Sequence, residues 1–194
     1  GIKMKQEIKI LKYLIEHNSQ KFTIREISKN LNIDYKNTYT CVQRLENSNN
    51  ITKEKIGNNF QIQSSNRLNS NTFEVEAIRR EELFENKDFK LIYNKIKKLD
   101  NPFVIVLLFG SFIKKINSKT SDIDLCVICN EEKTIKKLNE TLSVLPMHID
   151  LNEFSTDEFR SMITTNKSNV GKEIIKHNII LYGIENYYNL IQDE

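Results

Sequence analysis

Hydrophobic residues recur every three to four positions in three segments near the start of the chain. This period predicts amphipathic helices over residues 2–17, 23–31 and about 35–48. Thr23 and Glu26 have the spacing of a capping box at the start of the second helix. Three short helices are therefore expected here.

The third expected helix, for which Asp34 is a suitable N-cap, has two contrasting faces. Its inward positions are Thr38, Cys41, Val42 and Leu45. The opposite face presents polar and aromatic side chains of the types that reach base edges and phosphates. These outward residues are Tyr35, Lys36, Asn37, Tyr39, Thr40, Gln43 and Arg44.

Two strand-like segments, residues 51–56 and 60–63, flank Gly57-Asn58-Asn59 and predict a β-hairpin. Three helices followed by a two-stranded wing resemble a winged helix-turn-helix, the small DNA-binding module of many prokaryotic regulators. The resemblance covers about residues 4–64.

This resemblance implies a nucleic-acid-binding domain over residues 1–66. The seven outward residues of the third helix, together with Lys53 and Lys55 on the hairpin, are the expected DNA-binding residues. The alternative is a small helical module for protein contacts or dimerisation.

Polar residues 64–71 show no periodicity, so we place a domain boundary there, at residue 66. Two more amphipathic segments follow, the first with Thr72 as its expected cap and the second over residues 88–99. They predict a helical spacer over residues 67–100.

After Pro102 the pattern changes to that of a sheet with covering helices. The apolar run at 103–109 predicts a strand buried on both faces. The further expected elements are strands at 122–128 and 147–151, helices at 131–144, 156–164 and 171–177, an apolar stretch at 179–182, and a last turn or helix through Tyr187, Tyr188 and Leu190.

Composition supports a globular chain, since 39% of its 194 residues are hydrophobic and only two are proline. The longest apolar run, 104–109, is far shorter than the roughly 20 residues that span a bilayer. We expect a cytoplasmic protein without a membrane partner. Cys126 and Cys129 should point to opposite faces of a strand, which favours buried thiols over a zinc or redox pair.

Charge is unevenly distributed along the chain. Residues 1–70 contain twelve Lys/Arg and six Asp/Glu, whereas residues 71–194 contain seventeen and twenty. Only the basic first part is therefore suited to meet a polyanion.

Three acids stand in strand patterns of the second part. Asp122 and Asp124 are two apart, so they project from one face of their strand, and Asp150 lies between apolar neighbours on the next. Buried neighbouring carboxylates repel one another and are destabilising without a compensating cation. We therefore expect a divalent metal here.

Three short segments together resemble the motif of the DNA polymerase β-like nucleotidyltransferase superfamily. They are Gly110-Ser111, Asp122-Ile123-Asp124 and Ile149-Asp150-Leu151. The gap between Ser111 and Asp122 is closest to that of the minimal nucleotidyltransferases. The resemblance covers about residues 103–154 and implies such a domain over residues 101–194. The expected fold class is α/β, of the α+β kind: a winged helix-turn-helix, then a nucleotidyltransferase fold with a small mixed sheet flanked by helices.

The resemblance implies chemistry as well as fold. Asp122, Asp124 and Asp150 are the expected catalytic and metal-binding residues, holding Mg²⁺, with two ions when substrate is bound. Gly110 would let phosphates approach the backbone, and Ser111 would donate from the following helix start. Lys114 (or Lys115) could neutralise a triphosphate and Ser121 could orient the acids; both can equally be solvated loop residues. For His148, two residues before Asp150 on the same strand face, a structural role is favoured over contact with the site.

The function expected from these features is metal-dependent transfer of a nucleoside monophosphate, AMP from ATP, to a protein or RNA hydroxyl. One alternative is a DNA-binding transcription regulator that senses nucleotide without turnover. Another is an antitoxin that modifies a separate toxin partner, and a homodimer is a further option. For Tyr187-Tyr188, core packing is favoured over self-modification.

Overall fold

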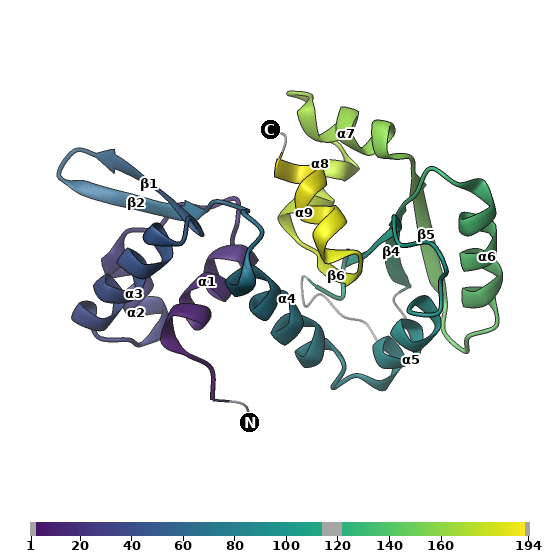
Figure 1. The fold of residues 1–194 in the computed structure, drawn as a ribbon, viewed down its shortest axis with the longest axis horizontal. Coiled ribbons are helices and arrows are strands. Elements are labelled where there is room, and N and C mark those ends of the chain that lie inside the picture. Colours follow the sequence, from purple (N-terminus) through teal and green to yellow (C-terminus); the bar gives the residue numbers. More distant parts are fainter. Residues whose placement is uncertain (1–2, 114–121, 193–194) are drawn as a thin grey trace. The chain divides into compact units, whose positions relative to one another are not determined.

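The computed structural model describes residues 3–113 and 122–192 (Figure 1). It divides into two compact units, residues 1–77 and 78–194. Helix α4 (Ser70–Leu83) contributes to both. Each unit is described by itself.

The first unit consists of three helices followed by a hairpin that projects beyond them (Figure 1). Its elements before α4 are α1 (Gln6–Glu16), α2 (Ile24–Leu31), α3 (Tyr35–Asn47), β1 (Ile51–Ile56) and β2 (Asn59–Ser64). The predicted capping box of α2 is present, and Asp34 accepts a hydrogen bond from the backbone of Asn37. The element order predicted for this unit is therefore confirmed.

The core of the first unit is built from the predicted apolar faces. The four inward positions of α3 are all buried, as are Leu11 and Leu14 of α1 and Ile27 of α2. Ile62 of β2 is fully buried and pairs with Phe22 in a short bridge before α2. This bridge ties the hairpin to the helices.

Helix α4 begins three residues earlier than a cap at Thr72 predicts, and Thr72 is not its cap. The Asn69 side chain accepts hydrogen bonds from the backbone of Asn71 and Thr72, so Asn69 caps the helix. Thr72 is buried, and its hydroxyl donates to the carbonyl of Arg67. The prediction failed because Thr72 is also held by Asn50, 22 residues away, which its local sequence does not reveal.

The second unit is a four-stranded mixed sheet with helices around it (Figure 1). Its strand order is β5-β4-β3-β6, in which β4 and β5 are parallel and the other pairs are antiparallel. After α4 its elements are α5 (Lys87–Ile96), β3 (Ile105–Phe109), β4 (Ile123–Ile128), α6 (Glu132–Ser143), β5 (Ile149–Phe154), α7 (Thr156–Thr164), α8 (Val170–Lys176), β6 (Ile179–Tyr182) and α9 (Ile184–Gln192).

Strand β3 lies inside the sheet and is buried on both faces, as its continuous apolar run predicts. Helix α6 is the crossover that a parallel pair requires, and it packs on the sheet through Leu138 and Leu142. Strand β5 continues to Phe154, beyond its predicted end, because it pairs with β4 over six residues. Strand β4 begins at Ile123, so Asp122 precedes it.

The cysteines and the C-terminal tyrosines belong to the cores. Cys41, Cys126 and Cys129 are buried free thiols, and burial raises the pKa of Cys126 to about 12. Tyr187 and Tyr188 are also buried, in agreement with core packing. Among the described residues, no helix combines the length and apolar character needed to cross a membrane.

Candidate functional site

Two of the three predicted acids lie side by side at one end of the sheet. Asp124 is on β4 and Asp150 is on β5, and the two are register partners in the parallel pair. Directly paired residues of neighbouring strands point to the same face, so both carboxylates share a face. Asp122 immediately precedes β4. It is two residues before Asp124, so the alternation of strand side chains directs it to the same face.

Gly110 completes this end of the sheet, directly after β3. Its neighbour Phe109 pairs with Asp124, and Gly110 has φ +81°, a conformation that side chains rarely adopt. A Cβ at Gly110 would collide with Oδ2 of Asp124 and would lie 2.9 Å from its carboxyl carbon. The glycine therefore leaves space above the carboxylate that any other residue would fill.

The turn after Gly110 rests on helix α5. Residues 111–113 form a turn, in which the ring of Phe112 meets that of Phe89 edge-on with 5.4 Å between centroids. Phe89 is 3% exposed and belongs to the core. The packing of its neighbour Phe112 therefore fixes the position of Ser111, next to Gly110. The described residues do not include Lys114, Lys115 or Ser121, nor most of the segment after Ser111 in which a helix start is expected.

Charge repulsion among the acids is present, although their burial is less than predicted. Burial, then Asp150 and then Asp122 raise the pKa of Asp124. Asp124 is half-buried, whereas Asp122 and Asp150 are exposed. The expectation of three buried carboxylates is therefore wrong, because Asp122 lies before the strand and β5 is at the edge of the sheet.

His148 contacts the site, contrary to the structural role predicted for it. Its Nδ1 lies 2.9 Å from Oδ1 of Asp122, and the two side chains are 76% and 55% exposed. The backbone carbonyl of His148 also accepts a hydrogen bond from Ile123. The register that pairs Ile123 with Ile149 brings His148 opposite Asp122. The sequence left this contact open but favoured a structural role, because the register was unknown.

The donor set fits a hard divalent cation, although the side chains are not gathered around one point. Within residues 3–113 and 122–192, no three His, Cys, Asp or Glu side chains are grouped to hold a metal. Carboxylate oxygens are the ligands that Mg²⁺ prefers, and the space left by Gly110 opens onto Asp124. Asp122 and Asp150 are exposed, so their side chains can rotate toward it.

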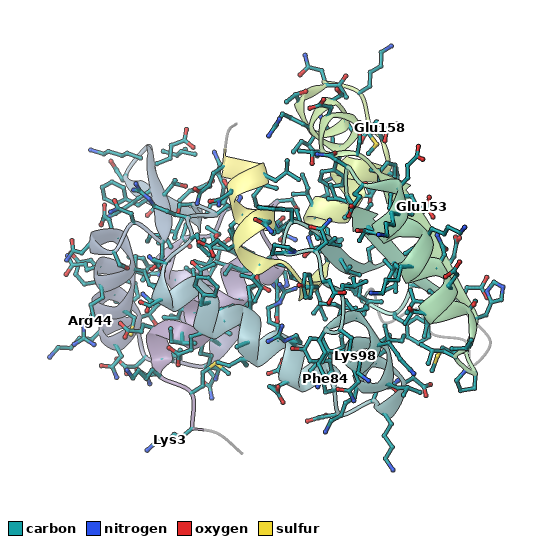
Figure 2. All side chains as sticks on the ribbon, turned by 45° about the vertical axis from the view of Figure 1, so that its right-hand side comes forward. Lys3, Arg44, Phe84, Lys98, Glu153 and Glu158 are labelled. Carbon is teal, nitrogen blue, oxygen red and sulfur yellow. The ribbon has the colours of Figure 1, made fainter. Side chains whose placement is uncertain are left out.

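The predicted nucleic-acid face of the first unit is exposed throughout. All seven outward residues of α3 are exposed, with Tyr35 at 54% and Tyr39 at 42%, and Arg44 extends outward (Figure 2). The Gln43 amide donates to the Tyr39 hydroxyl over 2.9 Å. These residues form a continuous polar and aromatic helix face.

The two lysines of the hairpin differ in their surroundings. Lys53 lies 3.2 Å from a carboxylate oxygen of Glu46 and stands over the ring of Phe60, 4.5 Å from its centroid. Lys55 is exposed on the same strand. Lys55 is therefore better placed than Lys53 to meet a partner.

Comparison with known proteins concerns the second unit. Residues 92–186 match the family model described as Polymerase beta, Nucleotidyltransferase. This part of the chain is similar to nucleotidyltransferases. No curated protein and no solved structure matches the chain. The match spans β3, β4 and β5, and so includes Gly110 and all three acids. It supports a nucleotidyltransferase domain with an α+β fold.

Proposed function

We propose that the chain is a Mg²⁺-dependent nucleotidyltransferase that moves AMP from ATP to a hydroxyl of a protein or an RNA. The observation that carries this proposal is the pairing of Asp124 with Asp150 beside Gly110, within the segment that matches the nucleotidyltransferase model. Carboxylates at neighbouring register positions suit a divalent cation with phosphate ligands.

Different residues of the chain would bind the phosphates, hold the metal and accept a proton at this site. Gly110 leaves room for phosphate oxygens next to Asp124, and Ser111 offers a hydroxyl at the same turn. Asp122, Asp124 and Asp150 would hold the metal, which when bound would neutralise charge on the reacting phosphate and its leaving group. Asp150, being exposed, can also accept the proton of an acceptor hydroxyl.

The proposal is tested by incubating the purified chain with Mg²⁺, labelled nucleoside triphosphates and candidate acceptors. We expect labelled acceptor and released pyrophosphate with the wild type, and at least a hundredfold less with Asp122→Ala/Asp124→Ala. Asp100→Ala is the matched control, because Asp100 is an exposed acid away from the site. Equal labelling by the wild type and the double variant would refute the assignment.

We further propose that the first unit is a winged helix-turn-helix that binds DNA through α3. The order of its elements, the exposed polar face of α3 and the positive balance of the first 70 residues support this. Arg44→Ala and Lys36→Ala should each weaken DNA binding and reduce the slope of log affinity against log salt by about 1. Lys90→Ala, an exposed lysine on α5, should change neither.

A second candidate is a transcription regulator that binds nucleotide without turnover. The exposed polar face of α3 favours it, because a regulator of this kind needs a surface that meets DNA. DNA affinity that changes with nucleotide, without release of pyrophosphate, would distinguish it from the transferase. A protein acceptor such as a toxin partner would instead be revealed by labelling of that partner.

A further inference from the structure

A cavity lies in the second unit, at the end of the sheet away from Gly110 and Asp124. Its volume is about 590 Å³, within the range of small-molecule sites of roughly 300–1,000 Å³. Ile105, at the start of β3, and Cys129, just after β4, both line it. At about 3.3 Å of rise per strand residue, Cys129 is roughly 17 Å from Asp124.

An exposed aromatic ring stands on this cavity. Phe103 lines it and is 77% exposed, the most exposed large hydrophobic residue in the described part of the chain. Its backbone is held in place, since Asn101 Oδ1 accepts from the Phe103 N–H over 2.9 Å and Asn186 donates to the Pro102 carbonyl over 2.7 Å. A flat apolar surface on a fixed backbone suits stacking of a planar ligand.

Polar groups in the cavity are available to a ligand. The amide of Asn189 is exposed on α9, and no hydrogen bond to it is found within the described residues. Asn130 uses its Oδ1 to accept from the backbone of Thr156 over 2.8 Å, which leaves its NH₂ group to donate elsewhere. The lining of the cavity therefore offers both donors and acceptors to a ligand.

Charges of both signs surround the cavity. Glu131 and Arg160 both line it, and hydrogen bonds from Thr134 and Asn101 lower the pKa of Glu131. An adjoining hollow of about 450 Å³ adds Lys133 and the pair Lys137 and Asp100, whose charged atoms are 3.2 Å apart. Such a surface is not specialised for a polyanion, so its ligand is expected to be close to neutral where it contacts the cavity.

We propose that this cavity binds an adenine base, stacked on Phe103 and read by the amide of Asn189. An asparagine amide carries a donor and an acceptor side by side, and an adenine edge presents the complementary pair. The base can belong to a free nucleoside or to a nucleic-acid strand. The site is separate from the proposed transfer site and needs no metal.

The test uses the full chain, adenosine and EDTA, so that neither phosphate nor metal can direct the ligand to the acids. Saturation-transfer NMR and calorimetry should show adenosine bound at least several-fold more tightly than uridine. Phe103→Ala should weaken adenosine binding by about tenfold or more. Asn189→Leu should bring adenosine and uridine to similar affinities. Both residues are exposed, so neither change should unfold the protein.

Controls separate this site from the rest of the molecule. Phe73→Ala removes an exposed ring, 41% accessible, that does not line the cavity, and should leave adenosine affinity unchanged. Asp124→Ala should also leave it unchanged, even if it abolishes nucleotidyl transfer. A second arm of the experiment replaces adenosine with a short adenine-containing oligonucleotide. If the oligonucleotide binds and adenosine does not, with the same dependence on Phe103, the base belongs to a nucleic-acid strand.

Three results would overturn the proposal. The first is no binding of adenine in either arm. The second is adenosine binding that Phe103→Ala leaves intact or that Asp124→Ala abolishes, since the ligand would then lie elsewhere. The third is displacement of adenosine from the cavity by a simple methyl glycoside at comparable concentration, which would indicate a sugar site.

Discussion

Gly110 and Gly57 form a matched pair for testing the site at the scale of single residues. Both have positive φ, +81° and +61°, so alanine strains the backbone at either position. Only at Gly110 does the new methyl group meet another side chain, that of Asp124; at Gly57 nothing lies within 4 Å. The difference between the two variants isolates the space above Asp124 from general backbone strain.

We predict that Gly57→Ala lowers the free energy of unfolding by about 1–2 kcal/mol and leaves nucleotide binding unchanged. Gly110→Ala should cause the same backbone strain and should also displace the Asp124 side chain. We therefore expect it to reduce nucleotide affinity in Mg²⁺ by more than tenfold. Thermal unfolding and calorimetric titration with a non-hydrolysable ATP analogue measure both effects. Equal nucleotide affinity in the two variants would contradict the role given to Gly110.

The contact of His148 with Asp122 predicts a positioning role. Hydrogen bonds to a ligating carboxylate orient it, and their loss typically weakens metal binding by 10–100-fold. We expect His148→Ala to weaken Mn²⁺ binding by about tenfold, measured by electron paramagnetic resonance of free Mn²⁺. His148→Asn, whose amide can replace the ring Nδ1, should retain most of the affinity. Unchanged affinity in His148→Ala would leave the contact without a role in metal binding.

Asp124 predicts a dependence of stability on pH. Its pKa is raised above the ordinary 3.8, so ionising it opposes folding at pH values above the raised pKa, and this penalty disappears as the pH falls below 3.8. Asp124→Asn should therefore stabilise the metal-free protein at pH 7, by less than about 1 kcal/mol because the site is partly solvated.

The gain in Asp124→Asn should vanish below pH 3.8, where the wild-type carboxyl is protonated in both folded and unfolded states. Denaturant unfolding in EDTA at several pH values measures it. Asp100→Asn, on an exposed side chain, should show no such trend. A variant less stable than the wild type at pH 7 would contradict the repulsion argument.

At the scale of elements, a buried asparagine joins α3 to α4. Asn50 is 1% exposed; its NH₂ group donates to Asn69 and Thr72, and its Oδ1 accepts from Asn71 and Ser48. All its hydrogen-bonding capacity is used. A buried polar network of this kind is destabilised when one member is removed, because the others are left unsatisfied.

Asn50→Ala should therefore lower the free energy of unfolding by about 2–3 kcal/mol. Asn47→Ala, at the exposed end of α3, should change it by less than about 0.5 kcal/mol. Chemical denaturation of both variants checks the difference. A cost for Asn50→Ala no larger than for its control would show that the network contributes little.

The same network marks the limit of what the sequence predicts about elements. Periodicity identified the buried face of α3 and local spacing identified the capping box of α2, because both depend on residues within one helix. The cap of α4 was misassigned because Thr72 is bound by Asn50, 22 residues away. The end of β5 was misplaced because its pairing with β4 decides it.

For the site, the motif identified the residue types and their strands, and pairing of the strands determined the rest. The register of the parallel pair β4 and β5 places Asp124 opposite Asp150. The same register brings His148 next to Asp122. Lys53 was assigned to DNA by its charge, whereas its contact with Glu46 depends on how β1 packs against α3. Local patterns carry no such information.

At the scale of the whole molecule, the predicted domain boundary at residue 66 can be set against the division of the structure after Ala77. The first 77 residues form one compact unit that includes Asn69, Thr72 and Val75, and Val75 is fully buried. A fragment that ends at residue 66 loses all three. A fragment that ends with α4 at Leu83 keeps them.

We predict that fragment 3–83 unfolds cooperatively and that fragment 3–66 melts roughly 10 °C or more below it. The shorter fragment lacks Val75 and three of the four side-chain partners of Asn50, namely Asn69, Asn71 and Thr72. Together these losses amount to several kcal/mol, and 1 kcal/mol corresponds to about 4–8 °C in a domain of this size. If DNA binding belongs to this unit, fragment 3–83 should bind with the salt dependence of the full chain, since the phosphate contacts that set the slope would all be present. Equal melting of the two fragments would place the boundary at residue 66, and a smaller salt slope in fragment 3–83 would mean that the second unit also contacts DNA.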